Sequence, residues 1–306
     1  MKDWRIYCEF SRPFTLLMPG VGMICGGLAA WGAQPRFVSS WTHSPWRVAW
    51  NVVLGAVMAV VLNAGSNGLN QMFDLPIDRI NKPQRPLPSG RLRSREAAGF
   101  TLGAFVVGLL LAWVINYQCL LLAVLAGIFT VSYSVPPFRT KRWGILANIT
   151  MAVPRGFLLP VAGWSTVKTI WVVEPWLLSS VLGLFILGAG TTKDFSDMEG
   201  DRAGGCKTLP VLYGVRKAAL LISPFFVFPF LLWAILVRLG KLTGHPAGIY
   251  TLSFSLPLIG AYIDYRILKN PDELSASENH VSWKLIYLMS IVAYAGIAVS
   301  YLLPRP

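Results

Sequence analysis

Charge is scarce in this sequence. Charged residues make up 13% of the 306 residues, about half the share of a typical soluble domain. The four cysteines are scattered without a CxxC pair, and the three histidines fall in predicted loops. Neither set has the spacing of a zinc site, and these absences exclude an ordinary soluble domain and a zinc protein.

Long apolar runs take the place of the missing charge, and hydrophobic residues make up 54% of the chain. A helix that crosses a bilayer needs about 20 consecutive apolar residues. No small-residue cleavage site follows the first run, so it is not a signal peptide. We therefore predict an all-α integral membrane protein with a single domain over residues 1–306. The nine predicted spans are 14–33, 48–71, 97–115, 118–134, 145–164, 175–192, 217–238, 247–267 and 281–303.

The net charge of +13 could indicate a nucleic-acid partner, but its distribution favours a membrane instead. With nine spans, 20 of the 27 Lys and Arg residues fall at the N-terminus and in the loops on its side, and six fall on the other side. Basic loops stay in the cytoplasm. We therefore expect the lipid bilayer as a partner, no nucleic acid, and a basic side that faces the cytoplasm.

Six of the 14 acidic residues lie in two short windows, each directly after an apolar span on the basic side. In the first window, Asn70, Asp74 and Asp78 recur every four residues and would form one stripe on a helix. Pro76 cannot donate a backbone hydrogen bond inside a helix, which predicts a kink or a restart between the two aspartates.

In the second window, Asp194, Asp197 and Asp201 would also share one helix face, whereas Glu199 points elsewhere and is given a lesser role. Facing carboxylates repel each other unless a cation lies between them. Mg²⁺ prefers oxygen ligands and keeps phosphate oxygens and water in its shell. The two stripes therefore predict a Mg²⁺–diphosphate site between spans. An ordinary solvated loop is the alternative for either window alone.

Four stretches of the sequence carry long, ordered motifs. Asn70–Gly90 reads NQMFDLPIDRINKPQRPLPSG, and Lys193–Gly214 reads KDFSDMEGDRAGGCKTLPVLYG. The other two are Tyr133–Arg142 (YSVPPFRTKR) and Phe10–Gly20 (FSRPFTLLMPG). These motifs resemble those of the UbiA superfamily of membrane prenyltransferases. The resemblance covers roughly residues 10–215. It implies a nine-helix bundle around a central cavity, with cap loops on the cytoplasmic side.

The resemblance implies Mg²⁺-dependent transfer of an isoprenoid chain from a geranylgeranyl or phytyl diphosphate to an acceptor. Metal ions neutralise the leaving diphosphate as its bond to the chain breaks. Asn70 would supply a neutral oxygen ligand or orient an aspartate. The predicted metal ligands and catalytic carboxylates are Asp74 and Asp78 in one cluster and Asp194, Asp197 and Asp201 in the other.

Positive side chains beside the motifs are candidates for binding the diphosphate, although cytoplasmic loops are basic for topological reasons as well. These candidates are Arg79, Lys82, Arg85, Lys141, Arg142 and Lys193. Arg155 lies inside the fifth span, where an unpaired charge is costly. It is predicted to bind an anionic acceptor group or the diphosphate, with a structural ion pair as the alternative. Tyr133 is predicted to face the carbocation, with an interfacial aromatic belt as the alternative.

The acceptor stays open at this point. The motifs look most like homogentisate prenyltransferases, which favours a small aromatic acceptor, while RPLPSG looks more like enzymes that prenylate chlorophyllide or a glyceryl phosphate lipid. A membrane terpene cyclase would use the same donor without an acceptor. From a different class, an ion-coupled transporter would place its carboxylates at mid-membrane depth, and here they lie at span ends. CDP-alcohol phosphotransferases need a DGxxAR run, which is absent.

Overall fold

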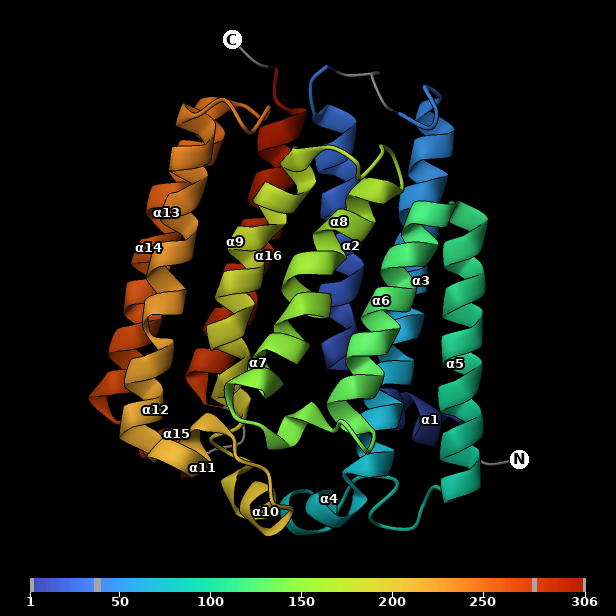
Figure 1. Cartoon of the computed structure of the whole chain (residues 1–306), viewed down its shortest axis with the longest axis vertical. Helices are drawn as coiled ribbons and strands as arrows, with labels where there is room; N and C mark the ends of the chain where they lie inside the picture. The colour runs from blue at the N-terminus through green and yellow to red at the C-terminus, as the bar shows by residue number, and fades with distance from the viewer. Residues whose placement is uncertain (1–2, 36–39, 277–279, 305–306) are drawn as a thin grey trace.

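Long helices run side by side along one axis and form a bundle (Figure 1). The computed structural model describes residues 3–35, 40–276 and 280–304. Within these ranges, nine helical segments are long and apolar enough to cross a membrane, which confirms the predicted all-α fold and its number of spans. Three residues that enter the predicted loop charges lie outside the described ranges: Lys2, Arg36 and Arg305.

Six of the spans are single helices: α2 (Pro13–Gly32), α3 (Pro45–Phe73), α5 (Ser94–Ile115), α6 (Tyr117–Ser134), α14 (Pro246–Lys269) and α16 (Val281–Leu302). The other three spans are composite. They are α7 (Ile145–Ala152) joined to α8 (Leu159–Ser165) by a π-helical turn at Val153–Leu158, α9 (Val173–Ala189) extended by a 3₁₀ turn at Gly190–Lys193, and α12 (Val215–Ile222) followed by α13 (Pro224–Arg238).

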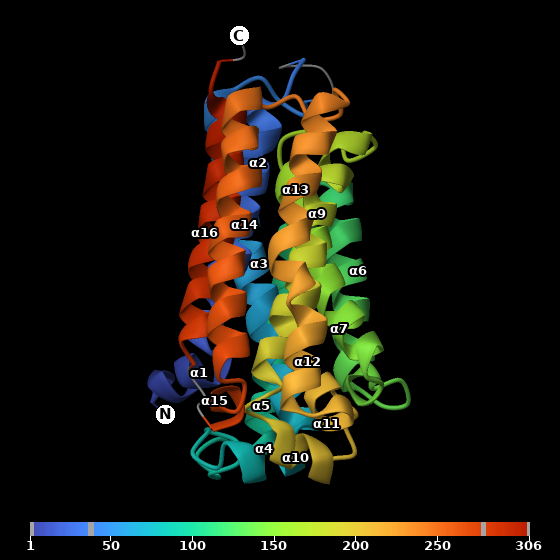
Figure 2. The same ribbon diagram turned by 90° about the vertical axis from the view of Figure 1, so that its left-hand side faces the viewer.

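The short elements outside the spans are α1 (Trp4–Ser11), α4 (Leu75–Asn81), a 3₁₀ turn at Thr140–Arg142, α10 (Met198–Ala203), α11 (Leu209–Tyr213) and α15 (Glu273–Ala276). All the short α-helices gather at one end of the bundle (Figure 2). Because α4 carries the end of the first acidic motif and α10 the end of the second, both motifs lie at the same end.

Glycines bring α2 and α8 into backbone contact. A β-carbon at Gly163 would lie 2.5 Å from the carbonyl oxygen of Met23, and one at Gly26 would collide with the carbonyl of Pro160. Helices in a lipid bilayer gain no hydrophobic driving force from associating with each other. Small residues allow their backbones to approach closely, and the resulting van der Waals packing holds the helices together. The contact holds the fifth span against the first, beside the central cavity.

This cavity, of about 690 Å³, lies inside the bundle. Its lining side chains come mainly from α2, α3, α6, the span α7–α8, α9 and α16, together with the two acidic motifs. Aliphatic residues such as Met23, Met58 and Leu122 line the part within the spans. A cavity with an apolar wall and a cluster of polar groups at one end has the character of a ligand site.

Candidate functional site

The first acidic motif begins on α3 and ends on α4. The helix breaks at Asp74 (φ −93°, ψ 9°) and restarts with Pro76 in the first turn of α4, as predicted. Backbone bonds from Asp74 N to Asn70 O (2.8 Å) and from Asp78 N to Asp74 O (2.7 Å) continue the helical spacing through the break. The Asn70 amide donates to Asp74 Oδ2 at 2.8 Å. Asn70, Asp74 and Asp78 all line the cavity.

The second acidic motif is not one helix, which corrects the predicted single stripe. A 3₁₀ turn ends at Lys193, turns follow, and α10 begins only at Met198. Asp197 therefore stands at the N-cap of α10, while Asp194 lies in the preceding turn. Asp194, Asp197 and Asp201 still line the same cavity.

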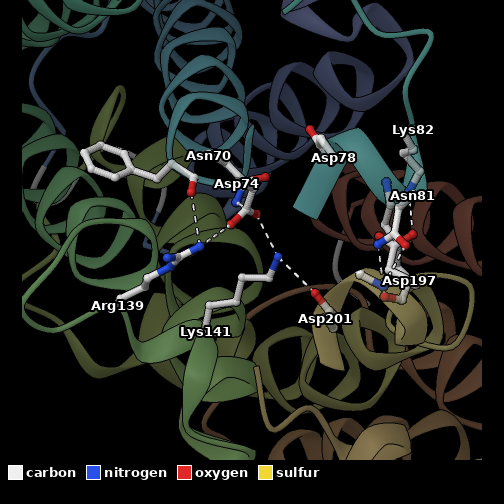
Figure 3. Close-up of polar contacts among 12 residues, drawn as sticks. Asn70, Asp74, Asp78, Asn81, Lys82, Arg139, Lys141, Asp197 and Asp201 are labelled. Atoms are coloured by element: carbon white, nitrogen blue, oxygen red, sulfur yellow. Dashed lines mark hydrogen bonds and ion pairs between the residues drawn. The ribbon is translucent and has the colours of Figure 1, made fainter. Parts of the chain in front are cut away.

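Lys141 joins the two motifs across the end of the cavity. Its Nζ lies 2.7 Å from Asp74 Oδ2 and 3.2 Å from Asp201 Oδ1 (Figure 3). Arg139 approaches Asp74 from the same segment, with its guanidinium 3.2 Å from Oδ1 and 3.1 Å from the Phe73 carbonyl oxygen. The aspartates of the two motifs are thus held close together, which is the arrangement that their spacing predicted.

Two further ion pairs involve Asp78 of the first motif and Asp197 of the second. Arg85 donates from Nη1 to both oxygens of Asp78 at 2.8 Å. Lys82, which follows the first motif in sequence, reaches Asp197 of the second motif at 2.6 Å. Together with Lys141, these contacts place basic side chains among the acids of both motifs.

Asn81 fastens the two motifs together through the backbone of the second. Its amide nitrogen donates to the carbonyl oxygen of Asp197 (3.0 Å), and its amide oxygen accepts from Gly200 N (2.9 Å). A β-carbon at Gly200 would lie 2.6 Å from the Asn81 amide, so only glycine allows this approach without a shift. The bond pair fixes α10 relative to α4.

Comparison with known proteins shows the family to which the chain belongs. The sequence model of the UbiA prenyltransferase family matches residues 21–301. This chain belongs to the UbiA prenyltransferase family. It is therefore a membrane prenyltransferase, and the alternative of an ion-coupled transporter is set aside.

Named relatives and solved structures agree with this assignment. The digeranylgeranylglyceryl phosphate synthase of Methanopyrus kandleri is 34% identical over 245 residues, which cover 79% of this chain and 82% of the relative. The synthase of the same name from Thermococcus gammatolerans is 30% identical over 293 residues, covering 95% and 98%. A UbiA homolog from Archaeoglobus fulgidus, solved with GPP and Mg²⁺, shares the fold with a TM-score of 0.74 at 21% identity over 97% of this chain and 99% of that one.

Most of the site residues predicted from the sequence of this prenyltransferase come together at the cavity. Eleven line it: Asn70, Asp74, Asp78, Arg85, Tyr133, Lys141, Arg155, Lys193, Asp194, Asp197 and Asp201. Lys82 is buried beside it in its pair with Asp197. Arg79 and Arg142 are exposed and do not line the cavity, so the structure does not support their predicted contact with substrate. Glu199 is also exposed.

Three residues that the sequence analysis did not select belong to the site. Arg12 lines the cavity from the bend between α1 and α2, Arg139 binds Asp74, and Asn81 joins the motifs. Each lies within a segment that resembles the family, which was the available signal. Their roles depend on contacts between segments far apart in sequence, so the spacing of residues within one motif does not reveal them.

Burial and neighbouring carboxylates raise the pKa of two aspartates of the second motif. Burial raises the pKa of Asp201 to about 6 against the opposing charge of Lys141, and Asp197 adds a smaller raising contribution. Burial, followed by the charge of Asp201, raises the pKa of Asp194 well above its usual range. Burial opposes the charged form of Lys141, but Asp74 and Asp201 outweigh it and raise the pKa of this ammonium. Added positive charge would stabilise these ionised carboxylates.

The carboxylates at the cavity fit a Mg²⁺ ion whose coordination shell is completed by oxygen atoms of the substrate. Within the described ranges, no group of three or more His, Cys, Asp or Glu side chains is arranged to hold a metal ion by itself. Mg²⁺ commonly takes only one or two carboxylates and fills its octahedral shell with water and phosphate oxygens. Asp194 faces the cavity and makes no side-chain hydrogen bond or salt bridge with any residue that the structure describes. Its carboxylate is therefore available to a cation in the cavity.

Proposed function

We propose that this enzyme transfers a geranylgeranyl-class isoprenoid chain from its diphosphate to the free hydroxyl of a glyceryl phosphate lipid, with Mg²⁺ as cofactor. The observation that carries the proposal is the meeting of both acidic motifs at one end of an apolar cavity, where Lys141 contacts Asp74 at 2.7 Å and Asp201 at 3.2 Å. The distribution of basic residues supports a cytoplasmic position for this end.

The named relatives support a glyceryl phosphate acceptor over the small aromatic acceptor that the sequence favoured. Relatives from Methanopyrus, Thermococcus and Pyrococcus all carry the name digeranylgeranylglyceryl phosphate synthase. Homogentisate, chlorophyllide and cyclisation without an acceptor thereby become the competing outcomes of an acceptor assay. The Archaeoglobus homolog with GPP and Mg²⁺ supports both the type of donor and the metal.

Each group of residues has a proposed role in the transfer. Asp74 and Asp78 would hold Mg²⁺ on one side of the diphosphate, and Asp194, Asp197 and Asp201 on the other. When bound, Mg²⁺ offsets the charge that develops on the leaving diphosphate. Arg85, Lys141, Lys82 and Lys193 add positive charge around the same head group, and Tyr133 at the end of α6 presents its ring to the cationic carbon.

The transfer exchanges one carbon–oxygen bond for another. The bond between C1 of the isoprenoid and the diphosphate oxygen breaks, and both electrons leave with the diphosphate. The acceptor hydroxyl oxygen then bonds to C1 and forms an ether, while the hydroxyl proton passes to the departing diphosphate. The apolar wall of the cavity keeps water from the cationic carbon in the interval.

An acceptor panel tests this proposal. Purified enzyme receives labelled geranylgeranyl diphosphate and Mg²⁺ with geranylgeranylglyceryl phosphate, homogentisate, chlorophyllide or no acceptor. We expect an ether product with the glyceryl phosphate, and loss of that product when EDTA removes Mg²⁺. Product from homogentisate or chlorophyllide in its place would overturn the acceptor assignment. A cyclic hydrocarbon from the donor alone would overturn the transfer reaction itself.

Asn81 provides a test of how the two motifs are spaced. We expect Asn81→Ala to lower kcat by about 10- to 100-fold, because small displacements of catalytic groups cost rate on this scale. The same variant should need more Mg²⁺ for half-maximal activity, since the two sets of carboxylates are no longer fixed relative to one another. Mg²⁺ titrations of the initial rate measure both effects. Asn270→Ala, at an exposed asparagine, is the control, and an unchanged Mg²⁺ requirement in a folded Asn81 variant would contradict the role.

A further inference from the structure

Two arginines face the cavity without a carboxylate partner. Lys82, Arg85, Arg139 and Lys141 all form salt bridges with motif aspartates. The side chains of Arg12 and Arg155 also line the cavity, but neither makes a hydrogen bond or a salt bridge with any residue that the structure describes. The structural ion pair that was the alternative for Arg155 is thus not formed within the described ranges.

An unusual backbone conformation aims Arg12 at the cavity. Its φ of 59° and ψ of 68° place it in the left-handed region, which is unfavourable for residues other than glycine. Side chains of α3 hold the bend: Asn67 Nδ2 donates to Ser11 O and to Thr15 Oγ1, each at 2.8 Å, and Gln71 Nε2 donates to Phe10 O at 2.7 Å. The fold thus maintains a strained conformation that directs one cation inward.

A different backbone irregularity exposes Arg155. It lies in the π-helical turn Val153–Leu158 that interrupts the fifth span between α7 and α8. Such turns are rare and often occur at functional sites. Tyr294 of α16 donates to the Arg155 carbonyl oxygen at 3.4 Å, while the Arg155 side chain remains open to the cavity. An unpaired charge within a span is costly and by default marks a functional site.

The charges of two other arginines act on Arg12. Burial, followed by the charges of Arg85 and then Arg155, lowers the pKa of Arg12 to about 10 against the weaker opposing charges of Asp78 and Asp197. Like charges gathered beside an apolar wall are stabilised when an anion lies among them. Guanidinium groups suit phosphate because they bind it with paired hydrogen bonds. Two guanidinium groups that line the same cavity are therefore suited to a phosphate-like ligand.

We propose that Arg12 and Arg155 form a second anion-binding subsite, beside the donor's diphosphate site, which binds the phosphate of the acceptor. This inference rests on the proposed function, because a glyceryl phosphate acceptor brings a second anion into the cavity. The donor's head group already has five aspartates for its metal ions, together with Lys82, Arg85, Lys141 and Lys193. An acceptor phosphate on Arg12 and Arg155 would place its glycerol hydroxyl inside the cavity that also receives the donor chain.

Substitution of each arginine separates acceptor binding from donor binding. For Arg155→Gln and Arg12→Gln, we expect KM for geranylgeranylglyceryl phosphate to rise at least about tenfold, the scale of a lost charged hydrogen bond. KM for geranylgeranyl diphosphate should stay unchanged. Equilibrium binding of the same acceptor in EDTA without donor should weaken in parallel. Arg79→Gln is the matched control, since Arg79 lies at the same end of the bundle but is exposed and outside the cavity.

A neutral acceptor makes the test specific for phosphate. Wild-type enzyme should prefer geranylgeranylglyceryl phosphate over geranylgeranylglycerol, and Arg155→Gln should lose most of this preference. A rise in donor KM with unchanged acceptor binding would overturn the subsite and leave the proposed function standing. A wild-type enzyme that neither binds nor prenylates the glyceryl phosphate would overturn both. If Arg12→Gln fails to fold, Arg155→Gln carries the test alone.

Discussion

Replacing Asp74 with asparagine is expected to lower kcat by about 10³-fold or more while the protein remains folded. Asp74 is the point where the contacts of the site converge, since Asn70, Arg139 and Lys141 all bind its carboxylate. Asparagine keeps the shape of the side chain but removes the charge that would hold Mg²⁺. Loss of one electrostatic contact to a transition state typically costs 10²–10³-fold, and loss of a metal ligand should cost at least as much.

The measurement for Asp74→Asn is single-turnover product formation at saturating donor, acceptor and Mg²⁺. Glu199→Gln is the matched control, because Glu199 belongs to the second acidic segment yet is exposed. The Glu199→Gln enzyme should retain nearly full activity, which would show that loss of a carboxylate near the site is not enough to lower kcat. If a folded Asp74→Asn enzyme turned over at the wild-type rate, Asp74 would not be a metal ligand.

The first acidic motif shows how far local spacing can be trusted. The four-residue interval between Asn70, Asp74 and Asp78 predicted one stripe, and Pro76 predicted a restart of the helix. Both hold in the structure, because the i→i+4 backbone bonds at Asp74 and Asp78 persist across the break. Information confined to a few neighbouring residues was sufficient here, as it was for the nine apolar spans.

The second motif shows where local spacing fails. Three aspartates that would share a helix face instead occupy a turn, an N-cap and a short helix. The close contact between Gly200 and Asn81 of α4 contributes to this conformation. A tertiary contact across more than a hundred residues overrode the helical period, although the aspartates still reached the predicted cavity.

The cations were the least predictable part of the site. Arg79 and Arg85 follow the same motif, yet Arg79 is exposed, whereas Arg85 pairs with Asp78. Adjacent residues on a helix point about 100° apart, which accounts for Arg79 diverging from Asp78. No comparable rule identifies Arg12, since arginine gives no signal for a left-handed backbone. Its conformation depends on Asn67 and Gln71 of α3, which hydrogen-bond to the preceding residues.

Replacing Lys141 with methionine should strongly destabilise the free enzyme. Lys141 bridges two buried carboxylates, and the side chains of Asp74 and Asp201 are only 5% and 2% exposed. Removing one partner of a buried ion pair leaves an uncompensated charge and costs about 3–5 kcal/mol. Here Asp74 keeps its ion pair with Arg139, whereas Asp201 loses the ammonium that it contacts, so a clear drop in the midpoint of thermal unfolding is expected in EDTA.

Mg²⁺ without substrate should restore part of this lost stability, because a dication between the motifs replaces the missing ammonium. The wild-type enzyme should gain less from Mg²⁺, since Lys141 already compensates Asp74 and Asp201 there. Thermal unfolding with and without Mg²⁺ measures both effects. Arg142→Met is the matched control, because Arg142 lies in the same 3₁₀ turn but is exposed. Equal Mg²⁺ stabilisation of wild type and Lys141→Met would mean that the ion does not bind between Asp74 and Asp201, and that the lysine and the metal serve separate parts of the site.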